Sequence, residues 1–233
     1  PSIGAFIAIV AAIMMIGRRI PRTIGIGIAA CIVIALGYRS HLQSRVWANT
    51  YDLLTNVLVH YPESHVAHNN IANAWRLEGR LDDAIGEFEK AIAIKPHPKI
   101  YANLGAVERK QGKLPEAKAT YQKALEINPQ SKEALMGRGL VWLAEKNYAA
   151  AERDFLAALA VHPSYLEALT NLGATYVAVG RYEDAVEKYR MALAVNPFFP
   201  EAHYNLGVAL MELQRFDEAT DAFASAVAEA PGF

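Results

Sequence analysis

Three histidines near residue 65 are the side chains of this chain best placed for metal chemistry. His60, His65 and His68 lie close in sequence, and the last two would share one face of a helix, as paired metal ligands do. A second interpretation is that His68 fills an interior aromatic position of a helical repeat, as His203 would do further along. We favour the second interpretation and predict no metal and no cofactor.

Two acidic pairs could in principle supply a general acid and a general base. Asp82–Asp83 and Glu183–Asp184 each precede a helical pattern, where negative charge complements the positive end of the helix dipole. The chain has no glycine-rich phosphate loop, no HExxH motif and no nucleophile elbow. We therefore expect no catalytic residue, and the chain itself is predicted not to be an enzyme.

Charge divides the 233 residues into two unlike parts. Residues 1–50 contain five arginines and no acidic residue, whereas residues 52–233 contain 18 Lys+Arg and 24 Asp+Glu. The acidic part has no basic stripe, so nucleic-acid binding is not expected. Cys31 is the only cysteine, which excludes a disulfide within one chain.

Residues 1–40 contain two uncharged apolar runs, 2–17 and 24–38, separated by a basic turn. We interpret residues 1–38 as a hairpin of two transmembrane helices, although 15 helical residues rise about 22 Å against a hydrocarbon core of roughly 30 Å. Tilt and snorkelling arginines would make up the difference. A cleaved signal peptide and a buried soluble hairpin are the competing interpretations.

The arginines also suggest an orientation for this hairpin. Three lie between Arg18 and Arg22 in the turn, while Arg39 and Arg45 follow the second run. The positive-inside rule places the turn in the cytoplasm and the rest of the chain on the extracytoplasmic side, with a margin of one charge. The chain opens inside an apolar run and closes on a motif that begins a repeat, so we expect it to be a fragment of a longer protein.

A repeat of about 34 residues fills the remainder. Prolines recur at steps of 34, 33, 34, 34 and 34 residues. They are Pro62, Pro96, Pro129, Pro163, Pro197 and Pro231. Within each copy, a small residue recurs where two helices would touch: Ala72, Gly105, Gly139, Gly173 and Gly207. An alanine and then an aromatic residue recur in the second helix. They are Ala84 and Phe88, Ala117 and Tyr121, Ala151 and Phe155, Ala185 and Tyr189, and Ala219 and Phe223.

This pattern resembles the tetratricopeptide repeat (TPR) family over Pro62 to Pro231. The resemblance implies an all-α fold, an α-solenoid of TPR helix hairpins with a concave groove, here preceded by the transmembrane helical hairpin. The expected units span residues 62–95, 96–128, 129–162, 163–196 and 197–230, within a repeat domain of residues 62–233. Residues 41–61 are predicted to form a capping or linker helix. In two copies Lys146 and Gln214 replace the glycine that ends the first helix.

In the TPR family, ligands usually lie against the first helices, and that resemblance supplies candidate binding positions. The polar candidates cluster in the first two units, and the matching positions of later units are apolar. The partner-binding candidates are Asn69, Asn73, Arg76, Asn103, Arg109, Lys110, Asn171 and Asn205. The carboxylate clamp of chaperone-binding relatives is only half present, because Glu133 and Gly137 stand where it has cations.

Four asparagines recur at one first-helix position, Asn70, Asn103, Asn171 and Asn205, and Gly137 interrupts them. A similar row in some glycosyltransferase-linked repeats grips the backbone of the substrate, so a ligand role is one interpretation. The other is that these amides form hydrogen bonds between helices of the stack.

Residues Trp47 to Ala74, following an apolar hairpin, resemble the join between membrane and repeat parts in membrane O-mannosyltransferase-like proteins. This leaves three hypotheses. The first is a membrane-anchored scaffold that binds a protein or peptide partner in its groove. The second is an acceptor-recruiting part of a glycosyltransferase whose catalytic part lies upstream, and the third is an anchored assembly factor. The sequence does not specify an oligomeric state.

Overall fold

The structure, a computed structural model, describes residues 50–229. The chain divides into two compact units, Pro1–His60 and Tyr61–Phe233, and each is described by itself. In the first unit, helix α3 spans Thr50–His60, inside the range predicted for a capping helix. The proposed transmembrane hairpin lies outside the described residues. Within residues 50–229, no helix is both long and apolar enough to cross a membrane.

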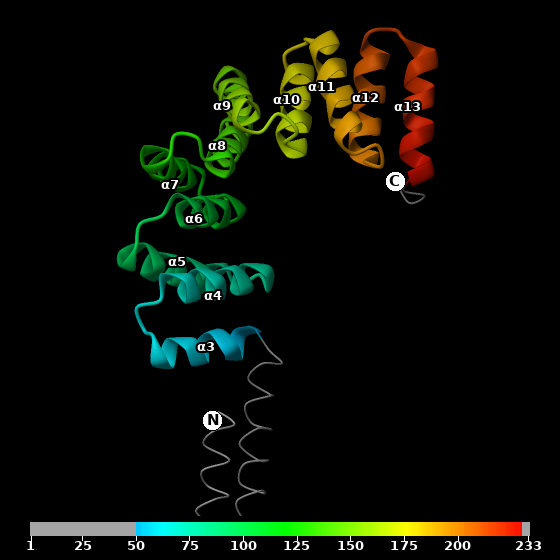
Figure 1. The fold of residues 1–233 in the computed structure, drawn as a ribbon. Helices are drawn as coiled ribbons and strands as arrows, with labels where there is room; N and C mark the ends of the chain where they lie inside the picture. The colour runs from blue at the N-terminus through cyan, green and yellow to red at the C-terminus, as the bar shows by residue number, and fades with distance from the viewer. Residues whose placement is uncertain (1–49, 230–233) are drawn as a thin grey trace, which may run out of the picture. The chain divides into compact units, whose positions relative to one another are not determined.

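The described part of the second unit consists of ten helices in five hairpins, and it contains no strand (Figure 1). The first helices of the hairpins are α4 (His65–Leu77), α6 (Pro98–Lys110), α8 (Lys132–Ala144), α10 (Leu166–Ala178) and α12 (Pro200–Glu212). The second helices are α5 (Leu81–Ile94), α7 (Leu114–Ile127), α9 (Tyr148–Val161), α11 (Tyr182–Val195) and α13 (Phe216–Glu229). The predicted all-helical solenoid of hairpins is confirmed.

Turn chemistry ends the first helices where the sequence predicted. Gly79, Gly112 and Gly180 adopt φ values of 79°, 79° and 77°, the left-handed region that glycine occupies without penalty. Lys146 and Gln214 take the same conformation at φ 57° and 59°, so the repeat geometry is kept at a local cost of about 1 kcal/mol per residue. The hairpin shape therefore overrides the local preference of these two residues.

In the second to fifth hairpins an aromatic ring of the second helix lies over a glycine of the first helix, and in the first hairpin Ala72 stands at the glycine position. A Cβ atom added at Gly139 would lie 2.5 Å from Phe155, and one at Gly173 would lie 2.7 Å from Tyr189. Real Cβ atoms essentially never approach so closely, so these positions require glycine. Behind each ring, the repeated alanine of the second helix is fully buried in all five copies. The periodic small and aromatic residues thus determine how the two helices of a hairpin pack together.

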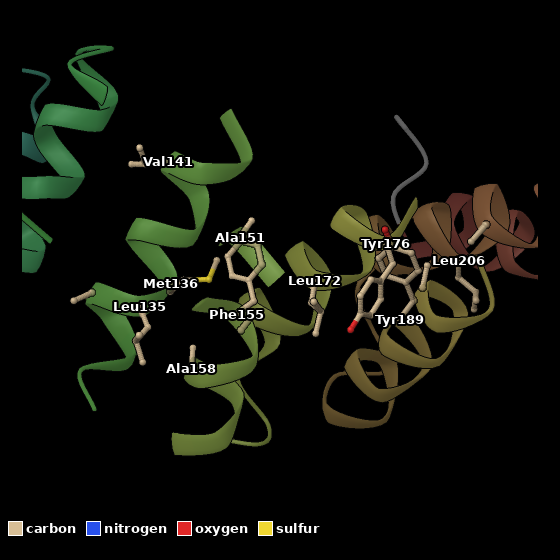
Figure 2. Close-up of a cluster of buried hydrophobic side chains, with 14 of the residues drawn as sticks. Leu135, Met136, Val141, Ala151, Phe155, Ala158, Leu172, Tyr176, Tyr189 and Leu206 are labelled. Atoms are coloured by element: carbon tan, nitrogen blue, oxygen red, sulfur yellow. The ribbon is translucent and has the colours of Figure 1, made fainter. Parts of the chain in front are cut away.

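Stacking of the hairpins joins these cores into continuous ones. Each second helix packs on the first helix of the following hairpin, and the first helices of neighbouring hairpins also contact one another. Figure 2 shows the largest cluster, in which buried side chains run from Leu135 on α8 to Leu206 on α12. One hairpin alone could not bury these faces, so its stability depends on its neighbours.

Candidate functional site

The first helices α4, α6, α8, α10 and α12 carry the predicted partner-binding positions. We call the surface formed by these positions the first-helix face. It comprises residues 69, 70, 73, 76 and 77 of α4 and the matching positions of the other four first helices. Neighbouring first helices contact one another, so these positions follow one another along the stack.

At the α4–α6 end of this face, the predicted asparagines do come together. The Asn103 amide on α6 donates to Asn69 Oδ1 on α4 at 3.1 Å, which links the first two repeats. Asn69 Nδ2 in turn donates to Asn70 Oδ1 at 3.2 Å. Asn73 Nδ2 donates to the Asn69 carbonyl at 2.9 Å, and its Oδ1 lies 3.4 Å from Arg76 Nε. These contacts favour the interpretation of the asparagines as links between helices, with Asn69 rather than Asn70 as the partner of Asn103.

The cations at this end are not neutralised by protein carboxylates. Arg76, Arg109 and Lys110 form no salt bridge within the described residues. Lys110 is exposed, and Arg109 is half-buried with its Nε lacking a hydrogen-bond partner among those residues. Three cations without a carboxylate partner in the described chain therefore give the surface at residues 76–110 a positive field, which suits an anionic ligand group.

The later asparagines do not extend this polar cluster. Asn171 Nδ2 donates to the Glu167 carbonyl at 2.6 Å, one turn back in its own helix. Asn205 is half-buried on α12, and the structure gives its side chain no hydrogen bond within residues 50–229. Gly137 breaks the series because the ring of Tyr121 occupies the place where its Cβ would stand. The interruption has a packing cause that the sequence did not reveal.

Towards α12 the first-helix face becomes apolar and more exposed. Met136 is buried, whereas Tyr204 and Met211 on α12 are 46% and 45% exposed. The Tyr204 ring also packs against Phe223, with centroids 5.6 Å apart. The face thus runs from a cationic, amide-rich end on α4 and α6 to exposed apolar side chains on α12.

His68 has a structural role in place of the metal site considered above. Its Nδ1 lies 2.5 Å from Glu87 Oε2, and its Nε2 lies 3.1 Å from the Pro62 carbonyl. Both partners are oxygen atoms of neighbouring segments, and together they fix the orientation of the ring. Among residues 50–229 no group of three or more His, Cys, Asp or Glu could hold a metal ion. His203 makes the matching bond to the Pro197 carbonyl at 3.0 Å.

Sequence reasoning missed Glu108, which places a carboxyl group in an apolar position. The equivalent residues of the other four repeats are Trp75, Trp142, Tyr176 and Leu210. Burial raises the pKa of Glu108, a hydrogen bond from Thr120 opposes that shift, and nearby Glu116 and Glu89 add to it. Its Oε2 has no partner within the described residues. The sequence did contain a signal for this residue, because Glu108 is acidic at a position where the other four repeats have an aromatic residue or leucine.

We expect Glu108→Leu to raise the free energy of unfolding at pH 7 by about 1 kcal/mol, because it removes a desolvated carboxylate. A carboxyl group whose pKa is higher in the folded than in the unfolded state destabilises the fold when it is ionised. This destabilisation grows as the pH rises from the unfolded pKa of 4.5 through the pKa of the folded state. The gain should therefore shrink below pH 4.5, as urea unfolding across pH would show. A constant gain, or the same gain from Glu126→Leu on the surface, would contradict this explanation.

A stack of helical hairpins with no catalytic constellation in its described part is typical of interaction scaffolds. The tetratricopeptide repeat model matches residues 52–97, 103–165, 144–197 and 170–232, and the chain belongs to the tetratricopeptide repeat family. No curated protein matches the chain in sequence.

Among solved structures, MamA is 25% identical, with a TM-score of 0.62 over 69% of this chain and 95% of MamA. YrrB, described as a TPR protein with an unusual peptide-binding site, is 20% identical, with a TM-score of 0.60 over 77% of this chain and 93% of YrrB. PilF of Pseudomonas aeruginosa is 22% identical, with a TM-score of 0.65 over 71% of this chain and 77% of PilF. These likenesses support the fold. They lend no support to the resemblance to O-mannosyltransferase-like proteins.

Proposed function

We propose that the repeats bind a protein or peptide partner along the first-helix face, with an acidic segment at the α4–α6 end. The observation that carries this proposal is the group formed by Arg76, Arg109 and Lys110, three cations that form no salt bridge within the described residues. The exposed apolar residues Tyr204 and Met211 would contact a hydrophobic part of the same partner. The peptide-binding site for which YrrB is described is consistent with such a role for this fold.

A peptide with an apolar body and an acidic end is a suitable probe. We expect the double variant Arg109→Glu, Lys110→Glu to weaken its binding by at least about tenfold, because attraction becomes repulsion. Titration calorimetry at low and moderate salt would measure the loss and its screening. The control variant Lys95→Glu, Lys123→Glu changes the net charge equally at two exposed positions, one directly after α5 and one on α7. Equal affinity of both variants for the probe would contradict the proposed site.

We also propose that residues 1–38 anchor the chain in a membrane, with the repeats on the extracytoplasmic side. Two apolar runs around a basic turn support this, and the argument rests on sequence alone. Thr220 is exposed on α13, so Thr220→Cys in a Cys31→Ser background should react with a membrane-impermeant maleimide in intact cells. Labelling only after cell lysis would reverse the proposed orientation.

A second candidate function is recruitment of acceptor proteins to a glycosyltransferase of the O-mannosyltransferase type. It rests on the likeness of residues Trp47 to Ala74 and on no structural observation. The reading frame that encodes Pro1 and what precedes it decides the matter. Several upstream membrane spans with an acidic pair in an early extracytoplasmic loop would favour this candidate, and a start codon immediately upstream would remove it.

A further inference from the structure

The loop before α12 carries an exposed aromatic ring at a position that is polar in the other repeats. Phe198 is 78% exposed. Glu63, Gln130 and Ser164 stand at the matching position of the first, third and fourth repeats, and all three are exposed. The second repeat is one residue shorter in this loop and lacks the position. The position thus lies on the surface wherever it exists, so packing of the stack does not explain an aromatic residue there.

Phe198 borders a hollow where the loop before α12 meets the last turns of α13, and we call it the Phe198 hollow. Its volume is about 520 Å³, and it is lined by Phe198, Pro200, Ser225 and Ala228. The Ser225 hydroxyl donates to the backbone carbonyl of Asp221 at 3.0 Å, within its own helix. The walls are therefore mostly apolar, and the volume lies in the range of small-ligand sites.

The α13 wall of this hollow lies beside the stack, not on the face where a further hairpin would pack. Each of the first four hairpins is followed by another first helix, and the residue matching Ala228 is nevertheless exposed in all four. These residues are Ala93, Glu126, Ala160 and Ala194. A helix packed on α13 in the same way would leave this wall accessible.

The fifth hairpin is strongly acidic. Residues 191–229 contain six Asp+Glu and one Lys+Arg. The one cation, Arg215, pairs with Glu218 at 2.6 Å. Glu218 also pairs with Arg190 of α11 at 2.7 Å, so a single carboxylate engages both arginines. The hairpin therefore keeps a net negative charge.

Two of its carboxylates lie beside the Phe198 hollow. Glu201 directly follows Pro200, and Asp221 precedes Ser225 by about one helical turn. Both side chains are exposed, and neither forms a salt bridge within residues 50–229. Glu201 lies in the first turn of α12, where the helix dipole favours it. Asp221 lies beyond the first turn of α13, so the dipole does not account for it.

The fourth repeat has the same two carboxylates in a different setting. Glu167 and Glu187 stand at the matching positions. Its second helix also carries Lys188 and Arg190, and the fifth repeat has alanine at both of those positions. Lys188 pairs with Glu187 at 2.6 Å. Because the fourth repeat also has Ser164 in place of the phenylalanine, only the fifth repeat combines an exposed ring with carboxylates that lack cations.

We propose that the Phe198 hollow docks a basic segment of a protein partner, at a site separate from the first-helix face. A bulky apolar side chain of that segment enters the hollow and contacts Phe198. Lysine or arginine residues on either side of it pair with Glu201 and Asp221. The same negative charge repels nucleic acids and anionic lipid surfaces, so a basic protein segment is the occupant that fits.

Photo-crosslinking of the full chain tests this proposal. The probe is a synthetic peptide in which one photoreactive phenylalanine analogue is flanked by lysines, and its counterpart has glutamate in place of lysine. We expect the lysine peptide alone to cross-link to residues 196–201 and 222–228, as mass spectrometry would map. Phe198→Ser restores the residue of the fourth repeat at an exposed position, and it should reduce the yield by about tenfold or more.

Two matched double variants test the charge and its location. Glu201→Lys with Asp221→Lys should reduce the yield by about tenfold or more, because attraction becomes repulsion. Glu167→Lys with Glu187→Lys makes the same charge change at the matching exposed positions of the fourth repeat, and it should leave the cross-links intact.

Several outcomes would overturn the proposal. It fails if the lysine peptide gives no cross-links, if they map elsewhere, if they persist in Phe198→Ser, or if both double variants reduce them equally. Self-association of the chain that Phe198→Ser abolishes would also overturn it, since a second copy would then fill the hollow.

Discussion

Replacing Gly137 by asparagine is expected to lower the free energy of unfolding by about 3 kcal/mol, the upper part of the range for an overpacked core. The substitution would restore the residue found at this position in the other four repeats. It would also place a Cβ atom inside the space held by the ring and hydroxyl of Tyr121. Urea unfolding followed by far-UV circular dichroism would measure the loss.

The position of the Tyr121 ring explains why the third repeat alone has glycine at the position where the other four repeats have asparagine. A Cβ at Gly105, in the same repeat as Tyr121, would lie 2.9 Å from the ring, compared with 2.5 Å for the matching pair Gly139 and Phe155. The Tyr121 ring has thus moved away from its own first helix and towards the next. The Phe155 ring stays closer to Gly139 in its own repeat. The space for the side chain of Asn171 on the next first helix is therefore free of this ring.

Two companion variants test that explanation. Gly137→Ala should account for most of the loss, because the overlap begins at Cβ. In a Tyr121→Ala background, Gly137→Asn should cost little, since the obstructing ring is gone. If Gly137→Asn is neutral with Tyr121 present, the asparagine series was interrupted for another reason, and a ligand role for the row would regain weight.

The repeat architecture could be predicted because each hairpin uses the same few contacts. A small residue, an alanine and an aromatic ring recur at a fixed period, and the packing that they require is local in sequence. Gly137 shows where this reasoning ends. Its identity is set by a ring 16 residues earlier that has shifted by a fraction of an ångström, and no periodic pattern encodes such a shift.

The binding surface was predictable only in outline. The sequence indicated where cations and asparagines would lie, but not how they are used. Asn69 and Asn103 bond to each other across two repeats, whereas Arg109 and Lys110 remain without carboxylate partners in the described chain. Whether two side chains pair depends on how far each one extends from its own repeat towards the next.

Replacing Asp154 by alanine is expected to lower the free energy of unfolding by about 3 kcal/mol, near the low end for breaking a buried ion pair. Arg138 on α8 donates to Asp154 on α9 through Nε and Nη2, both at 2.7 Å. The side chains are only 21% and 9% exposed. Arg138 also donates to Gln122 on α7, so the lost carboxylate would leave a charge held at the junction of two repeats.

The other copies show how the same site is filled without charge, and they supply the matched control. Arg138 corresponds to Ile71, Leu104, Leu172 and Leu206. Asp154 corresponds to Ala222 in the fifth repeat. The double variant Arg138→Leu, Asp154→Ala therefore reproduces the fifth repeat, and it should recover most of the stability that Asp154→Ala loses. A coupling energy near zero in thermal or urea unfolding would contradict this account. Recovery would show that apolar side chains can replace the ion pair at this position without loss of stability.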